Sequence, residues 1–323
     1  MCAYASPSNR PFGKCFAKPA EVHLAATSGQ TKTDWPTILV AVAFWISFIA
    51  MVLANQHLPT VIVVAALAVL GGLYMSLQHE VIHGHPTQVR WLNWLLVAAP
   101  LGMVLPLDRY RDTHLEHHRA VLTDPVSDPE SKYVSAEAWQ RSSGAYRRLL
   151  FVNQTLAGRL TVGVVLSVVR SILGDLREMR TRSIVRRAWL LHLVGVAALV
   201  VVLRAVSMPL WAYALGFVFG GSSLTSLRSF AEHLAVEHGP RTAMVHSGWF
   251  FSLIFLNNNL HYAHHEAPAV SWFRLPALAQ QLGADTTVAG TAGLYRGYGN
   301  IARRYFFRPF VYPVHPISAT IDA

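Results

Sequence analysis

The chain has 323 residues, of which 53% are hydrophobic and only 14% are charged, and its formal net charge is +10. A soluble globular chain carries roughly 25% charged residues, so this composition excludes intrinsic disorder and favours an integral membrane protein over a water-soluble enzyme. Strongly basic chains can bind nucleic acid. Here the apolar composition argues that the positive charge follows membrane topology, and we expect no nucleic-acid partner.

The chain is expected to begin with a polar tail over residues 1–34. This tail holds both cysteines, Cys2 and Cys15, which give neither a disulfide framework nor a Cys-x-x-Cys metal site. It lacks the apolar core of a cleaved signal peptide. We expect a single membrane domain to follow over residues 35–310, and a short C-terminal tail over residues 311–323.

Two helical hairpins are predicted to cross the membrane. Residues 35–79 contain no Asp, Glu, Lys or Arg, which is long enough for two spans of about 20 residues each. We predict spans near 36–54 and 59–79, separated by the polar turn before Pro59. A second pair is predicted near 188–208 and 209–227, with its turn at Met208-Pro209, because proline is tolerated at a helix start.

The positively charged residues predict the orientation of both hairpins. Of the 27 Lys and Arg residues, only Arg204 lies at the far turn of a hairpin, and all others lie on the side of the termini. By the positive-inside rule, the termini face the cytoplasm. Residues 156–174 carry Arg159 and Arg170 in an apolar background and are expected to form an amphipathic surface helix.

Sixteen histidines are present, and eight of them fall into three short groups. The groups are His79-Glu80-x-x-His83, His114-x-x-His117-His118 and His261-x-x-His264-His265. Residues i, i+3 and i+4 share one helix face, so each group should present its imidazoles to one point in space. Neutral imidazole is a common ligand for zinc, copper, iron and nickel. Eight imidazoles exceed the needs of one metal ion, whereas two ions would use them all.

All three groups follow an apolar segment, at the predicted membrane surface. Two further apolar stretches, 91–107 and 242–260, would separate the groups onto opposite faces if they crossed the membrane. We therefore expect both stretches to be interfacial or re-entrant. The aromatic stretch 305–310 is interpreted as a surface-packing or interfacial segment, with a docking site for an electron donor as the alternative.

The three histidine groups, in this order and at these separations, resemble the membrane fatty acid desaturase and hydroxylase superfamily over roughly residues 36–310. His-Glu-x-x-His-Gly-His-Pro at 79–86, Asp-Pro-x-x-Asp-Pro-Glu-Ser at 124–131 and Asn-Asn-Asn-Leu-His at 257–261 look like its short bacterial branch, which is similar to carotenoid ketolases and the dihydrorhizobitoxine desaturase. The resemblance implies an all-α integral membrane fold, with four transmembrane helices and a cytosolic helical cap around a histidine-ligated di-metal site. A bacterial inner membrane, with the metal site on its cytoplasmic side, is the expected location.

The resemblance also implies a ligand set and its cofactors. Two iron ions (Fe2+/Fe3+), with dioxygen as co-substrate, would be held by the histidines of the three groups: His79, His83, His114, His117, His118, His261, His264 and His265. The superfamily usually has one more histidine between the second and third groups, for which His233 is the best candidate and His238 the alternative.

Ligating histidines usually donate their other ring N–H to a carboxylate or carbonyl. Glu80, Asp112, Glu116 and Glu232 are near enough in sequence to accept this bond, and Asn258 is a candidate for holding a metal-bound water. No catalytic residue is expected beyond the metal site and these supporting groups.

The expected function is an oxidoreductase that uses dioxygen and two electrons to abstract hydrogen from an unactivated C–H bond of a lipid-like substrate from the bilayer. A fatty acyl desaturase is the first interpretation, and a hydroxylase or ketolase is the alternative. The chain has no haem motif or cysteine cluster, so electrons should come from a separate ferredoxin, rubredoxin or cytochrome-like partner.

Two other classes of protein are weaker alternatives. A membrane zinc protease would use His79 and His83 as ligands and Glu80 as general base, but it would leave both H-x-x-H-H groups unused. A metal transporter should carry its ligands within the spans, near the membrane midplane. Here the spans are nearly free of ionisable residues, and the histidines lie outside them.

Overall fold

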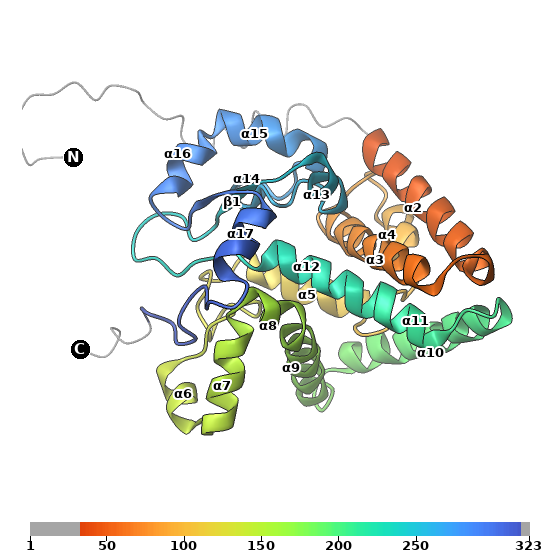
Figure 1. Ribbon diagram of the computed structural model, residues 1–323, viewed down its shortest axis with the longest axis horizontal. Coiled ribbons are helices and arrows are strands. Elements are labelled where there is room, and N and C mark those ends of the chain that lie inside the picture. The colour runs from red at the N-terminus through yellow and green to blue at the C-terminus, as the bar shows by residue number, and fades with distance from the viewer. Residues whose placement is uncertain (1–32, 318–323) are drawn as a thin grey trace, which may run out of the picture.

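The computed structural model describes residues 33–317, and four of its helices are long and apolar enough to cross a membrane. The described chain is mostly helical, with one two-stranded parallel sheet (Figure 1). The four long helices are α2 (Trp35–Leu53), α3 (Thr60–Ile82), α10 (Ser183–Ala205) and the continuous helix α11–η2–α12 (Leu210–Ser229). The last of these consists of α11 (Leu210–Tyr213), η2 (Ala214–Gly220) and α12 (Gly221–Ser229). The prediction of an all-α membrane protein with two helical hairpins is confirmed.

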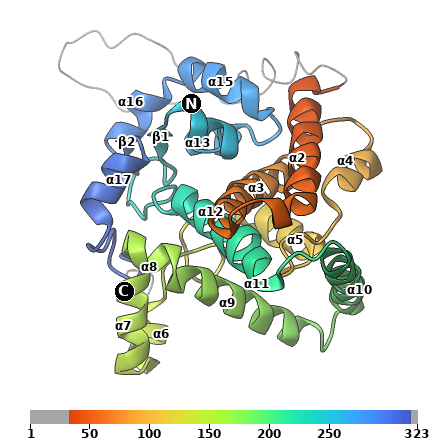
Figure 2. The same cartoon turned by 45° about the vertical axis from the view of Figure 1, so that its right-hand side comes forward.

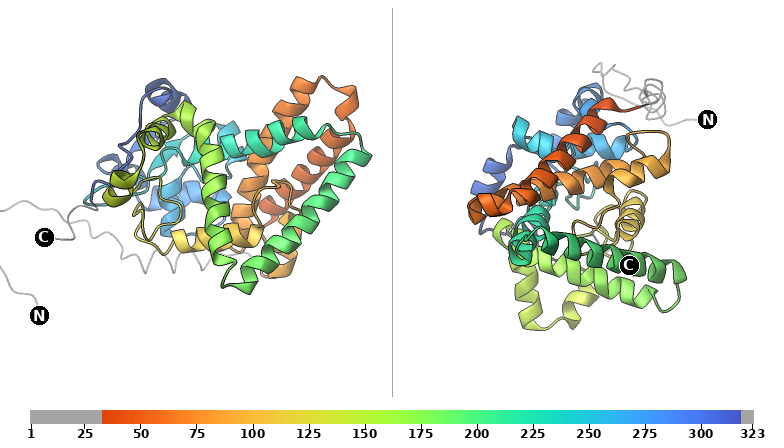
Figure 3. Two further views of the ribbon diagram at one scale, coloured as in Figure 1. Left: turned by 90° about the horizontal axis from the view of Figure 1, so that it is seen from below. Right: turned by 90° about the vertical axis from the view of Figure 1, so that its right-hand side faces the viewer.

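The other elements form a cap at one end of these four helices, and Figure 3 shows cap and long helices side by side. The exception is η1 (Asn55–His57), which lies in the turn between α2 and α3 at the opposite end, where Asn55 donates to the Val206 carbonyl. The cap elements are α4 (Arg90–Val97), α5 (Leu107–His117), α6 (Ala136–Arg141), α7 (Gly144–Asn153), α8 (Leu156–Leu160), α9 (Val162–Glu178), β1 (Met244–His246), α13 (Trp249–Ile254), α14 (His261–Glu266), η3 (Trp272–Arg274), α15 (Leu275–Gln281), α16 (Ala284–Ala289), β2 (Leu294–Arg296) and α17 (Tyr298–Tyr305).

The helix bounds differ from the predicted spans at the ends that face the cap. Helix α3 continues to Ile82 and therefore carries His79 in its last turns. Helix α10 begins at Ser183, before the predicted start at 188, and includes the exposed Arg186 and Arg187. Charged residues limit how much of a helix lies in hydrocarbon, but they do not end the helix, because its backbone hydrogen bonds are internal.

Helix α3 packs closely against η2 and α12 through glycines. A Cβ on Gly71 would overlap the carbonyl oxygen of Phe217, and a Cβ on Gly221 would lie 2.7 Å from the carbonyl carbon of Gly71. Small residues allow two membrane helices to approach this closely. Beside this contact lies a buried cluster of aromatic side chains, formed by Phe44, Phe48, Tyr74, Tyr213 and Phe217.

Neither of the shorter apolar stretches forms a helix long enough to cross a membrane. Residues 91–107 form α4 and an irregular segment that hydrogen bonds attach to the long helices. The Tyr74 hydroxyl donates to the Val97 carbonyl (2.8 Å), and the Tyr213 hydroxyl donates to the Leu101 carbonyl (2.9 Å). Residues 242–260 form β1, α13 and a turn. Strand β1 pairs in parallel with β2, which the sequence analysis did not predict.

The predicted surface helix over 156–174 is wrong in its continuity, because the chain breaks at Thr161 (φ −119°, ψ −83°) into α8 and α9. Before the break, Gly158 of α8 packs so closely on the Val152 carbonyl of α7 that a Cβ would clash with it. Helix α9 then runs across the direction of α10, as Figure 2 shows. One side of α9 exposes Val165, Val169, Leu173 and Leu176, so α9 is amphipathic.

Both predicted tails are described only in part. Apart from Thr33 and Asp34, the N-terminal tail with Cys2 and Cys15 lies outside the described residues, as do residues 318–323. The chain from 311 to 317 packs against the segment after α5. The Val134 N–H donates to the Pro313 carbonyl (2.9 Å), and the His315 N–H donates to the Val134 carbonyl (3.0 Å).

The close contact between α3 and α12 predicts a large effect for one added methyl group. Gly71→Ala should lower the free energy of unfolding by about 1–3 kcal/mol, because the new Cβ overlaps backbone atoms that cannot move away. Gly174→Ala on α9 is the matched control, because its Cβ meets nothing within 4 Å. Thermal unfolding in detergent should show a lower Tm only for Gly71→Ala. Equal Tm values would contradict the packing.

Candidate metal centre

Nine histidines from four separate parts of the chain meet where the long helices join the cap. The end of α3 supplies His79 and His83, and α5 supplies the second group. Helix α14 supplies the third group, and His233 follows α12. Most of these side chains are buried, and His117 is only 1% exposed.

The nine imidazoles divide into two groups, each of which could hold a metal ion. Within each group, the possible ligand nitrogens all lie within 4.8 Å of one another. The groups adjoin each other, since the rings of His118 and His265 stack with centroids 4.2 Å apart. The first group contains His79, His83, His114, His118 and His264, and the second contains His117, His233, His261 and His265.

The division corrects the expectation that each H-x-x-H-H group points to one place. In α5, His114 and His118 belong to the first group of imidazoles, whereas His117 belongs to the second. In α14 the split is repeated, because His261 and His265 share one group and His264 joins the other. Residues i and i+4 lie about 40° apart around a helix, and residues i+3 and i+4 about 100° apart. One H-x-x-H-H segment can therefore serve two adjacent sites.

The spacing of the ring nitrogens fits coordination to metal ions. The Nε2 atoms of His83 and His114 lie 3.1 Å apart, those of His118 and His264 3.1 Å, and those of His233 and His261 2.9 Å. Two imidazole nitrogens bound at 2.0–2.1 Å would lie about 2.9 Å apart at a right angle and about 3.3 Å apart at the tetrahedral angle. Within residues 33–317, the buried Nε2 atoms of His117 and His265 have no hydrogen-bond partner.

Two carboxylates after α5 determine which ring nitrogens can face the metal ions. The Asp128 carboxylate lies 2.7 Å from Nδ1 of His117, and the Glu130 carboxylate lies 2.9 Å from Nδ1 of His114. Each Nδ1–H therefore donates outward, which leaves the Nε2 lone pair directed into the cluster. Asp128 is itself fixed, because it accepts the backbone N–H groups of Thr123 (2.8 Å) and Glu130 (2.9 Å).

Most of the histidines outside the long helices are held neutral. Burial, followed by the neighbouring imidazoles, lowers the pKa of His118 to about 3. The same causes lower the pKa of five others: His83, His233, His261, His264 and His265. For His117, burial lowers the pKa, but Glu130 and Asp128 outweigh burial and raise it. Neutral imidazole is the form that binds a metal ion.

Three of the predicted supporting groups lie beside the histidines. The Glu232 carboxylate lies 3.5 Å from Nδ1 of His261 and 3.4 Å from Nε of Arg228, and burial raises its pKa to about 7. The Asn258 amide lies between Nδ1 of His261 (3.1 Å) and Nε2 of His79 (3.3 Å). Glu80 lies 4.0 Å from Nδ1 of His79 and accepts the backbone N–H of Trp272 (3.3 Å).

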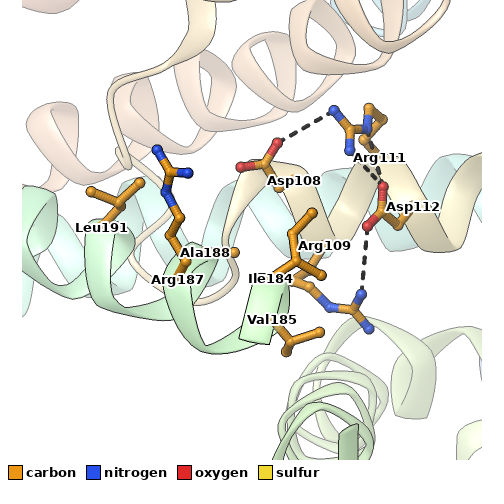
Figure 4. A pocket seen from close by; sticks show the side chains of 9 residues that line it. All are labelled: Asp108, Arg109, Arg111, Asp112, Ile184, Val185, Arg187, Ala188 and Leu191. Carbon is orange, nitrogen blue, oxygen red and sulfur yellow. Dashed lines mark hydrogen bonds and ion pairs between the residues drawn. The ribbon is translucent and has the colours of Figure 1, made fainter. Parts of the chain in front are cut away.

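The structure does not bring Asp112 to the histidines. Its carboxylate pairs with Arg111 (2.7 Å) and Arg109 (3.6 Å) beside a pocket of about 260 Å³ between α5 and α10 (Figure 4). Asp112 lies five positions before His117 in α5, which turns its side chain towards a different side of the helix. Glu116 is exposed, and His238 is an exposed loop residue.

Sequence reasoning missed Asp128 and Glu130 as supporting groups. Both belong to the acidic segment 124–131, in which the sequence alone indicates a family resemblance but no role for either carboxylate. They lie 11 and 16 positions from their histidine partners. No helical spacing relates residues across such a loop, so only the fold of the loop could reveal the contacts.

One comparison with known proteins gives a match. A family model described as fatty acid desaturase matches residues 55–292, which is more than half of the chain and includes all nine histidines. No curated protein matches the chain.

The Asp128 contact predicts a loss of metal affinity when its charge is removed. Asp128→Asn should weaken metal binding about 10–100-fold, because His117 loses the acceptor that fixes its orientation. Asp124→Asn is the matched control, since Asp124 lies in the same loop but accepts from Ser127 and Val126, not from a histidine of the cluster. Competition between each purified variant and a chelator measures the affinity. Equal affinities in the two variants would show that Asp128 does not support a ligand.

Proposed function

This chain belongs to the fatty acid desaturase family, and from that premise we propose that it desaturates a fatty acyl chain at a histidine-bound pair of iron ions. The family makes it a desaturase- or hydroxylase-type oxidoreductase of the membrane. The two adjoining histidine groups are the observation that carries the finer proposal. A structural role for the histidines would not require so many ring nitrogens to face one another.

The proposed reaction converts one CH₂–CH₂ unit to CH=CH. It consumes one dioxygen, two electrons and two protons, and it releases two water molecules. When bound, the iron pair would supply dioxygen activation and abstraction of hydrogen from an unactivated C–H bond. The histidines of α3, α5, α14 and the segment after α12 would hold these ions as neutral ligands. Asp128 and Glu130 would keep the Nδ1 protons of His117 and His114 on the outer side.

The position of the histidines supports a substrate that comes from the bilayer. His79 lies in the last turns of the apolar helix α3, and His233 follows the last residue of the apolar helix α11–η2–α12. An acyl chain held in the hydrocarbon beside these helices would therefore lie close to the histidines. Most ring atoms of the site are buried, which would keep bulk water away from the reacting carbon atoms.

The arrangement favours this proposal over a zinc protease. In a protease, His79 and His83 would bind zinc, and Glu80 would activate water. Here His79 and His83 share a group with histidines of α5 and α14. The Glu80 carboxylate accepts from the Trp272 backbone N–H, which leaves it poorly placed to act on a substrate in the cluster.

Mutation of one histidine from each group should separate the two proposed metal ions. His264→Ala and His117→Ala should each lower the iron content and abolish acyl desaturation, because each removes a ligand from a different group. The exposed His238→Ala is the control and should retain about two irons per chain. Iron is measured by mass spectrometry of purified protein, and products by gas chromatography. A hydroxylated product would favour the hydroxylase, and full activity in His117→Ala would exclude the di-iron proposal.

We further propose that the cap and both termini face the cytoplasm of a bacterial inner membrane. The excess of Lys and Arg on the cap side supports this orientation. A fluorescent protein fused after residue 140 or after residue 317 should fluoresce, because both positions should lie in the cytoplasm. A fusion after residue 207, in the turn between α10 and α11, should be active as periplasmic alkaline phosphatase. Phosphatase activity after residue 140 would reverse the orientation.

A further inference from the structure

A basic aromatic surface lies at the end of α17. Phe307 is 80% exposed and Phe306 is 43% exposed, and exposed arginines flank them. We define the arginine–phenylalanine patch as Arg303, Arg304, Phe306, Phe307 and Arg308. Residues 286–317 contain four arginines and no Asp or Glu, so the sequence around the patch does not neutralise its charge.

The patch arginines are available for a partner. Within residues 33–317, none of the three forms an ion pair, although the Arg304 guanidinium lies 5.2 Å from the centre of the Tyr305 ring. Exposed phenylalanines beside unpaired arginines are typical of protein interfaces, where aromatic residues and arginine are enriched.

The backbone of the patch is fixed, although its side chains are exposed. The Phe306 carbonyl accepts the N–H of Ala157 in α8 (3.0 Å), and the Phe310 N–H donates to the Gln154 carbonyl (2.8 Å). These two hydrogen bonds hold the chain before and after Phe307 and Arg308. A partner that docks on it would meet a preformed surface and would not have to order the chain.

Packed aromatic rings connect the patch segment to the histidine cluster. The Phe310 ring lies 5.1 Å from the Tyr305 ring and 5.3 Å from the Phe230 ring, measured between centroids. Phe230 is 1% exposed and lies three residues before His233. The Nε2 atom of His233 lies 2.9 Å from that of His261. The patch therefore sits at the surface end of a compact path that leads to the second histidine group.

We propose that the arginine–phenylalanine patch is the docking surface for a small acidic one-electron carrier protein of the ferredoxin class. This inference rests on the proposed function, which needs two electrons for each product. Each docking event oxidises one reduced carrier by one electron and reduces the metal site by one, so two events supply a turnover. The positive charge selects an acidic partner. Helix α17 lies on the cap side of α12, away from the turn between α10 and α11 (Figure 1), which favours a protein over a lipid surface.

Binding of a plant-type [2Fe–2S] ferredoxin to the metal-loaded, detergent-purified protein tests the proposal. Arg303→Glu/Arg304→Glu should weaken binding at least about tenfold at low salt, because two attractions become repulsions, and the affinity of the unmodified chain should fall as salt rises. Phe307→Ala should weaken binding with little salt dependence. Arg177→Glu/Arg180→Glu is the matched control on another exposed basic segment and should bind like the unmodified chain.

Several outcomes overturn the docking surface. Undiminished binding by Arg303→Glu/Arg304→Glu, or equal weakening by the control, would show that the patch is not specific. If vesicles containing phosphatidylglycerol, and not ferredoxin, bind through the patch, the patch is a lipid-binding surface.

Reduced methyl viologen, a small reductant that needs no docking, separates the docking proposal from the proposed function. If the patch variant makes product with viologen but not with ferredoxin, docking is supported. The unmodified chain and the variants can also all fail to make product with either reductant, while ferredoxin binding still depends on the patch. In that case the proposed function fails and the docking surface stands.

Discussion

The structure depends on the convergence of nine imidazoles, buried or half-buried, whose ring nitrogens face one another. Lone pairs held about 3 Å apart in a buried site repel each other unless cations lie between them. The surroundings fit two divalent ions, because four carboxylates lie around the cluster: Glu80, Asp128, Glu130 and Glu232. Negative charge on these carboxylates favours bound cations, and Arg228 pairs with Glu232. The carboxylates lie on the outer side of the rings, so they orient the ligands without occupying the space between them.

The packing of the membrane helices fixes the positions of several histidines in this cluster. Glycine contacts bring α3 and α12 so close that the histidines at the end of α3 and after α12 can face the same cluster. Helix α5 lies beside them and supplies both groups at once. Most of the candidate ligands therefore lie on helices or at their ends, whereas His233, Asp128 and Glu130 lie in the segments between helices. Sites built on helices are held more precisely than sites built on loops.

Much of this arrangement could be predicted from the sequence, because the signals are local. Uncharged apolar runs predict spans, and histidines three and four apart predict clusters on a helix face. The assignment of each histidine to one of two groups could not be predicted by treating a helix face as one direction, since the 100° between His117 and His118 separates two sites. The break at Thr161 and the β1–β2 pairing depend on packing against distant segments. The same is true of Asp128 and Glu130, whose contacts cross a loop with no regular period.

The positive charge of the chain has more than one physical role. The arginines near α9 and the start of α10 lie where the long helices meet the cap, and they accord with the topology rule. Helix α17, which carries Arg303 and Arg304, lies in the cap, farther from the long helices (Figure 1). The topology rule does not explain charges at that distance. They lie next to exposed phenylalanines, on a backbone that α8 holds in place. A buried redox site needs an approach for electrons as well as one for substrate. As proposed, the acyl chain would approach from the hydrocarbon side along the long helices, and the electron carrier would approach from the aqueous side at the arginine–phenylalanine patch.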